Sequence, residues 1–158
     1  MTKPSVYLET SFISYLTARP SRDLIVAGHQ AITAEWWENR RHDFELFISP
    51  VVYEEVSRGD PQAATKRIAM LSGIISLEMS ESVFQFANLL INNQTVPEQE
   101  LRDALHIAAA CVNGITYLLT WNCRHIANAE KRGEIDQLCI EHNYVSPIIC
   151  TPEELLGG

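Results

Sequence analysis

The sequence predicts an α/β fold in which a mostly parallel sheet of about four to five strands carries helices on both faces. Short apolar segments alternate with longer amphipathic segments along the chain, as they do in strand–helix–strand units. Helix start and stop signals lie between these segments. Hydrophobic residues make up 46% of the chain and charged residues 20%, which is typical of a globular domain.

Five apolar segments have the length and composition of buried strands, and helical spacing predicts helices between them. Ser49-Pro50 is a helix start, with a capping residue before a proline, and Asn113-Gly114 is a helix end. The expected strands cover residues 5–8, 44–49, 74–78, 115–120 and 147–150. The expected helices cover residues 12–18, 24–41, 50–59, 61–72, 81–93, 98–112 and 126–142, with a last turn at 152–156.

We expect residues 1–158 to form one domain, because no repeat, low-complexity segment or linker divides the chain. No apolar run reaches the ~18 residues that a membrane span requires, and the N-terminal residues do not resemble a signal peptide. The expected location is therefore the cytoplasm, with no membrane partner. The four cysteines form no close pair, which favours free thiols over a zinc or redox motif.

The charge balance argues against a protein that wraps nucleic acid by bulk electrostatics. Twelve basic residues stand against twenty acidic ones, which gives a net charge of −8, whereas such binding needs clustered Lys and Arg. The charge balance does not exclude a nuclease, because a bound divalent cation reverses the local charge where phosphate must approach.

Two glutamates are candidates for a functional site. Glu9 follows the first expected strand, where a helix begins; the alternative is an exposed acid near a helix N-terminus, favoured by the helix dipole. On a helical wheel, Glu55 falls within the apolar stripe of Val51, Val52 and Val56, and the neighbouring glutamate at position 54 falls outside it. An inward carboxylate must be paired, protonated or bound to a cation, so its partner is either a metal or a structural Arg or Lys.

Asp103 lies on the expected helix 98–112, at the edge of a stripe that is expected to face the core and begins at Leu101. From this edge its side chain can reach a cleft; the alternative is a carboxylate paired with Arg102 or Arg58. His106, three residues later, lies opposite the stripe on the wheel, and we expect it at the surface or at its boundary.

Thr120 and Asn122 follow the expected strand 115–120, although Asn122 is also an ordinary turn residue. In a parallel sheet the residues beyond the carboxyl ends of the strands gather at one edge. Clustered carboxylates raise one another's pKa unless a cation is present, and oxygen ligands favour Mg²⁺ or Mn²⁺. We therefore expect Glu9, Glu55 and Asp103 to converge on one divalent-metal site.

At these residues the sequence resembles the PIN-domain family, and within it the VapC-type toxins of bacterial toxin–antitoxin pairs. The similarity extends from Tyr7 to about Leu155. The matching segments are Tyr-Leu-Glu-Thr-Ser at 7–11, Ile-Ser-Pro-Val-Val-Tyr-Glu-Glu-Val at 48–56, Asp-Ala-Leu-His-Ile-Ala-Ala-Ala at 103–110 and Leu-Leu-Thr-Trp-Asn at 118–122. The resemblance implies a three-layer PIN-like fold.

The resemblance also implies a set of site residues. Glu9 stands where the family has an aspartate, whereas Glu55 and Asp103 match its conserved acids. Asn122 replaces the last aspartate of the family, which removes a charge and weakens a second metal position. Thr10 and Thr120 match polar residues in the family's site.

The implied activity is Mg²⁺- or Mn²⁺-dependent hydrolysis of RNA by a toxin that pairs with an antitoxin protein and forms a homodimer. Arg58, Arg102 and Arg124 are candidate phosphate contacts by position. Two alternatives remain open. The chain can be a catalytically degenerate PIN-like module that binds RNA or a protein, with Asn122 as its mark, or another metal-dependent enzyme such as a phosphatase or DNA nuclease.

Overall fold

The computed structural model describes residues 2–157. Within this range, five parallel strands form one sheet in the order β3-β2-β1-β4-β5. The strands are β1 (Ser5–Leu8), β2 (Glu45–Ile48), β3 (Ile75–Ser76), β4 (Tyr117–Leu119) and β5 (Ile148–Cys150). The predicted fold class is therefore confirmed, with a sheet that is parallel throughout.

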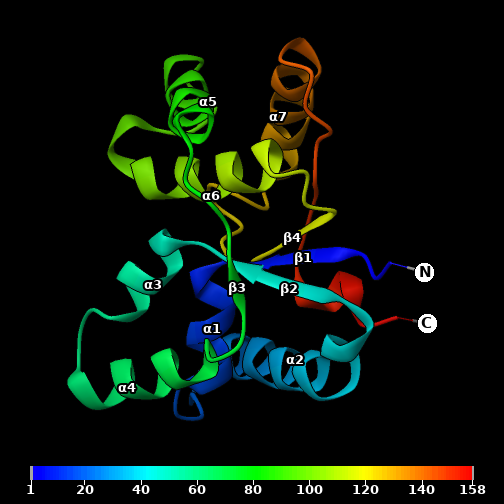
Figure 1. Cartoon of the computed structure of the whole chain (residues 1–158). Helices are drawn as coiled ribbons and strands as arrows, with labels where there is room; N and C mark the ends of the chain where they lie inside the picture. Colours follow the sequence, from blue (N-terminus) through cyan, green and yellow to red (C-terminus); the bar gives the residue numbers. More distant parts are fainter. Residues whose placement is uncertain (1, 158) are drawn as a thin grey trace.

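Helices cover both faces of the sheet and make three layers. α6 lies above the sheet in Figure 1, with α5 and α7 beyond it, whereas α1 and α2 lie below. The helices are α1 (Thr10–Thr17), α2 (Leu24–Arg40), α3 (Pro50–Val56), α4 (Pro61–Met70), α5 (Glu81–Asn92), α6 (Leu101–Val112) and α7 (Ala129–Glu141). The expected turn after residue 151 is a 3-10 helix, Pro152–Leu155. Among residues 2–157, no helix is both long enough and apolar enough to cross a membrane.

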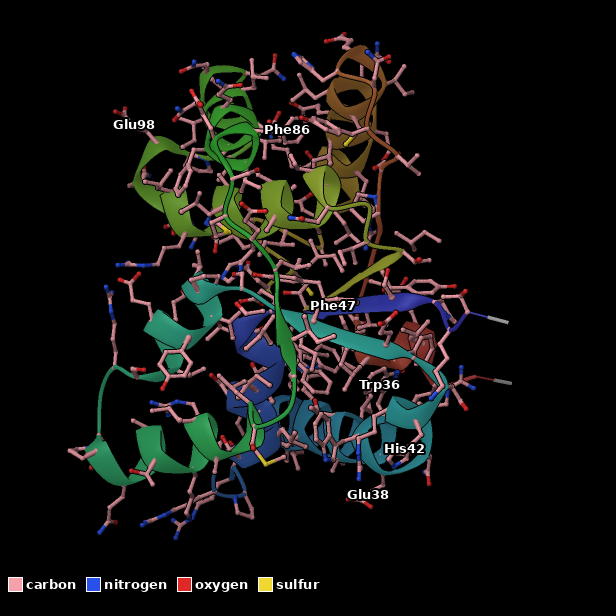
Figure 2. The ribbon with its side chains drawn as sticks, viewed as in Figure 1. Trp36, Glu38, His42, Phe47, Phe86 and Glu98 are labelled. Carbon is pink, nitrogen blue, oxygen red and sulfur yellow. The ribbon has the colours of Figure 1, made fainter. Side chains whose placement is uncertain are left out.

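Large aromatic side chains fill the core on both sides of the sheet. On the α2 side, Trp36 stacks on Phe44 with ring centroids 5.6 Å apart and meets Phe12 edge-on at 5.4 Å. On the opposite side, Phe86 of α5 meets Tyr144 edge-on at 5.5 Å. Figure 2 shows Trp36 and Phe86 on opposite sides of the strands. The first two contacts pack α1 and α2 against each other and against the residue that precedes β2, and the third joins α5 to the segment after α7.

The environment of α6 corrects two expectations. All residues from 104 to 111 are buried, because α5 packs along the side of α6 that faces away from the sheet. His106 is therefore fully buried, not at the surface or at its boundary. Leu101, expected to face the core, is 47% exposed, because it lies at the first residue of α6, where the covering layer ends.

The carboxyl edge of the sheet brings residues from distant parts of the chain together. The ladder between β1 and β4 continues one residue beyond β1, because the backbone N–H of Glu9 donates to the carbonyl of Leu119, the last residue of β4, at 3.1 Å. The N–H of Thr120 likewise donates to the carbonyl of Cys150 at 3.0 Å. Glu9 and Thr120 are therefore adjacent at this edge, although 111 positions separate them.

Candidate active site

Glu9 connects β1 to α1 and is nearly inaccessible, with 4% of its surface exposed. It is the N-cap of α1, which begins at Thr10, two residues before the expected start at residue 12. Its carboxylate accepts hydrogen bonds from the Ser11 backbone N–H at 3.1 Å, the Ser11 hydroxyl at 2.5 Å and the Thr120 hydroxyl at 2.5 Å. These three donors hold a buried carboxylate in one orientation.

Glu55 points from α3 toward the same place. Its Oε1 accepts a hydrogen bond from the Thr10 hydroxyl at 2.7 Å and lies 2.5 Å from Nε2 of His106. Burial raises the pKa of Glu55, but the hydrogen bond and charge of His106, together with the Thr10 hydroxyl, lower it further than burial raises it. Glu55 is therefore held in its ionised form.

Glu54, the neighbouring carboxylate on α3, faces solvent. Its Oε1 lies 2.5 Å from a guanidinium nitrogen of Arg58 and 3.2 Å from one of Arg102. All three side chains are about half exposed. The two arginines considered as alternative partners of Asp103 are thus bound to Glu54.

His106 connects the two glutamates to the core. Its Nδ1 lies 2.7 Å from the Tyr7 hydroxyl, which in turn lies 2.7 Å from the Ser49 hydroxyl. On the other side of the ring, Nε2 lies 3.9 Å from Glu9 and within hydrogen-bonding distance of Glu55. Tyr7, Ser49 and His106 are fully buried, so this chain of contacts is shielded from water.

The charge of His106 follows from these neighbours. Burial lowers the pKa of His106, but the hydrogen bond with Glu55 and the negative charges of Glu9, Glu55 and Asp103 raise it above its ordinary value. The helical wheel predicted an exposed or boundary position for His106, because a wheel takes the side opposite the apolar stripe to face solvent. The Asp-x-x-His spacing was the available signal, since it places both side chains on one face of a helix.

Asp103 lies beside the two glutamates, and its carboxylate has a separate set of neighbours. The pKa of Asp103 is above its ordinary value, mainly because the carboxylate is buried and also because Glu9 and Glu100 are negatively charged. A hydrogen bond with the side-chain amide of Asn122 lowers the pKa but does not outweigh these effects. The Oδ1 of Asn122 accepts from the backbone N–H of His125 at 3.0 Å. The side chain of Asn122 thus interacts both with Asp103 and with the segment that follows β4.

Two groups of possible metal ligands therefore occur among residues 2–157. Within each group, one donor atom from every residue lies within 4.8 Å of the others. The groups are Glu9, Glu55 and His106, and Glu100, Asp103 and His125. Asp103 is electrostatically coupled to Glu9 but belongs to the second group. All three predicted carboxylates thus lie at one edge of the sheet. Glu9 and Glu55 form a pair, and Asp103 lies next to them in the second group.

A cleft of about 390 Å³ opens onto this edge. It is lined by Glu55 and Asp103 together with Arg102, Glu100 and residues of α3 and the start of α6. Arg58 reaches its rim through Glu54. Arg124 lies exposed on the segment after β4 and is not among the residues that line the cleft.

The fold and the site together define an α/β protein with a buried carboxylate–histidine centre at the carboxyl edge of a parallel sheet. The fold is similar to that of VapC20 from Mycobacterium tuberculosis, a solved structure described as a sarcin-ricin loop cleaving toxin. The match has a TM-score of 0.60, covers 77% of this chain and 92% of that chain, and has 18% sequence identity. No protein-family model and no curated protein matches the chain. The structural likeness confirms the PIN-like fold that the resemblance implied.

Proposed function

We propose that residues 1–158 form a single VapC-type PIN domain that hydrolyses RNA phosphodiester bonds with Mg²⁺ or Mn²⁺. One observation carries the proposal: donor atoms of Glu9, Glu55 and His106 lie within 4.8 Å of one another at the sheet edge of a fold similar to an RNA-cleaving toxin. In open parallel sheets, ligands bind at this edge.

The donor set fits a divalent cation. Glu9 and Glu55 are candidate ligands whose orientations are already held by Ser11, Thr120 and Thr10, and Asp103 is the third candidate. A divalent ion at these residues would supply a water of lowered pKa and would neutralise the charge of the substrate phosphate. Because the carboxylates are held in advance, little reorganisation is needed when the ion binds.

The surrounding residues of the chain have distinct roles in this proposal. Thr10 orients the carboxylate of Glu55, and Asn122 orients that of Asp103. Arg102 lines the cleft, where its guanidinium can contact a phosphate of the RNA. Arg58 at the rim and Arg124 on the segment after β4 are further candidates for contacts to the RNA backbone.

A degenerate module is the second candidate function, and one observation favours it. His106 lies against the ionised Glu55 with a raised pKa, so an imidazolium supplies positive charge to the carboxylates without a metal. Asn122, in place of a fourth acid, further lowers the negative charge of the site. A chain of this kind would bind RNA or a protein partner without cleaving it.

RNA cleavage by the purified protein, with and without divalent ions, separates the two candidates. We expect RNA cleavage with Mg²⁺ or Mn²⁺ and no cleavage after chelation. The cleavage rate of Asp103→Asn should fall by more than about 100-fold, because losing a partner outside the ligand shell already costs up to that much. An inert wild type whose Asn122→Asp variant cleaves RNA would establish the degenerate module. Cleavage that persists without divalent ions would exclude the metal mechanism.

The proposed toxin role brings with it a cytoplasmic location, an antitoxin partner and a homodimer. An antitoxin is encoded beside its toxin in such pairs, so a small reading frame next to the gene is the first observation to make. Co-expression of the two chains should yield a complex in which RNA cleavage is suppressed. Light scattering of the purified chain measures whether it is dimeric.

A further inference from the structure

The imidazole of His106 is aimed at a space that it shares with both glutamates. Its Nε2 lies 2.5 Å from Oε1 of Glu55 and 3.9 Å from Oε2 of Glu9. Ligand atoms around a tetrahedral ion with bonds of 2.0–2.1 Å are about 3.3 Å apart. Small movements of side chains that already face one another would therefore give three donors at ligand spacing.

The opposite side of the imidazole is held in the way that metal-binding histidines require. A ligating histidine commonly donates its second ring N–H to an oxygen, which sets the tautomer and the ring orientation. Here Nδ1 contacts the Tyr7 hydroxyl at 2.7 Å, and that hydroxyl contacts the Ser49 hydroxyl at 2.7 Å. With Nδ1 occupied in this way, Nε2 is the nitrogen that is left for an ion.

The arrangement goes beyond a simple ion pair between His106 and Glu55, because Glu9 also directs an oxygen at the imidazole. The Oε2 of Glu9 accepts a hydrogen bond from the Ser11 N–H and faces Nε2 at 3.9 Å, which is too long for a hydrogen bond. Glu9 and His106 are both more than nine-tenths buried. A second buried carboxylate beside the pair is what an ion held by all three residues would use.

We propose that His106 is a nitrogen ligand of the metal centre, so that Glu9, Glu55 and His106 hold Mn²⁺, Co²⁺ or Zn²⁺ in preference to Mg²⁺. The inference rests on the proposed function only in placing a divalent ion at these carboxylates. Oxygen-only ligands suit Mg²⁺, whereas an imidazole ligand shifts a site toward transition ions and zinc. When the ion binds, the proton of Nε2 goes to solvent and the ion takes its place between the imidazole and Glu55.

Imidazole nitrogen NMR of the full-length wild type, titrated with Zn²⁺, tests the ligand directly. The chain has five histidines, and we expect the Nε2 resonance of His106 to shift with one equivalent of zinc while its Nδ1–H remains. The proposal is overturned if calorimetry detects zinc binding but the His106 resonances do not shift, or if the His125 resonances shift instead. It is also overturned if calorimetry detects no zinc binding. The wild type suffices for this test, so it does not depend on the stability of a variant.

Metal selectivity provides a second test. If the role of His106 were purely structural, the relative affinities for the three ions would not change. Tyr7→Phe removes the hydroxyl that holds Nδ1 but retains the ring. We expect Zn²⁺ and Mn²⁺ to bind about 10–100-fold more weakly to this variant, with a smaller loss for Mg²⁺. An equal loss for all three ions would contradict the proposal. His42→Gln, an exposed histidine far from α6 in Figure 2, is the matched control and should bind all three ions as the wild type does.

The same protein in an RNA cleavage assay distinguishes failure of this inference from failure of the proposed function. Cleavage with Mg²⁺ by a chain whose His106 does not respond to bound zinc would overturn the ligand role and retain the nuclease. Zinc coordination by His106 in a chain that leaves RNA intact with every ion would support the ligand role and overturn the nuclease.

Discussion

Nε2 of His106 lies 2.5 Å from Oε1 of Glu55 at the buried carboxyl edge of the sheet. Burial alone would shift both pKa values toward the neutral forms, but their mutual contact outweighs it, lowering the pKa of Glu55 and raising that of His106. Breaking such a pair by removing one partner costs more than the pair contributes, because the other charge remains buried. The behaviour of the site with pH, mutation and metal therefore depends on this contact.

The stability of the metal-free protein should fall as the pH rises above 6.5. The pKa of His106 is higher in the folded chain than its ordinary value of 6.5, so its contribution is fully present below pH 6.5 and is lost as the pH rises through the folded pKa. Urea unfolding in the presence of a chelator, from pH 6 to 9, measures this slope. A His106→Gln variant should have a flatter profile, and an identical profile would show that His106 does not titrate there.

At acidic pH, the contribution of Glu55 to stability should have the opposite dependence and decrease as the pH falls. Its folded pKa lies below its ordinary value of 4.5, so its contribution is present above pH 4.5 and is lost as the pH falls through the folded pKa. Thermal unfolding of the wild type and Glu55→Gln between pH 3 and 6 makes the comparison. The two melting temperatures should converge at the acid end, and a constant difference would contradict the assignment.

The two adjacent glutamates of α3 should differ sharply in their importance. Glu55→Gln removes a charge held by Thr10 and His106, and we expect RNA cleavage to fall by more than about 100-fold. Glu54→Gln breaks only exposed ion pairs with Arg58 and Arg102, which contribute about 0–1 kcal/mol to stability. It should retain most of the activity. Comparable losses in both variants would show that the inward orientation of Glu55 is not what matters.

The hydroxyl of Thr120 should be needed for metal affinity. Thr120→Val keeps the shape but removes a donor to Glu9 and an acceptor for the N–H of Asn122. Metal binding measured by calorimetry should weaken about 10–100-fold. Thr33→Val is the matched control, because Thr33 is equally buried and accepts a hydrogen bond from Trp121. It should cost about 1–3 kcal/mol of stability without a change in metal affinity.

Arg102 should contribute to RNA affinity in a salt-dependent way. Its guanidinium lines the cleft, so Arg102→Ala should raise KM and lower the slope of log affinity against log salt by about 0.7, the value for one contact to single-stranded nucleic acid. Lys3, which precedes β1 at the opposite edge of the sheet, provides the control charge. If Lys3→Ala and Arg102→Ala changed the slope equally, general charge and not the cleft would attract the RNA.

Local pattern was sufficient for the order of the elements. Strands follow from short apolar runs, helices from apolar spacing of 3.6 residues, and helix starts from capping signals such as Ser49-Pro50, all of which act within a few residues of the chain. The inward position of Glu55 on α3 is also local, because a helical wheel separates it from Glu54. Even the gathering of Glu9 and Thr120 at one edge follows from parallel strands that end there.

Only the tertiary structure decided the surroundings of His106 and Asp103. A wheel assigns a solvent side to every amphipathic helix, but α5 covers the side of α6 that faces away from the sheet, so His106 is buried against Tyr7 and Glu55. The pairing of Asp103 with Asn122, and of Arg58 and Arg102 with Glu54, likewise joins residues from different elements. The sequence by itself therefore determined which elements form and which carboxylates lie at the same edge of the sheet. Packing between layers decided which charges lie in contact, because burial and hydrogen bonding depend on neighbours that are distant in the chain.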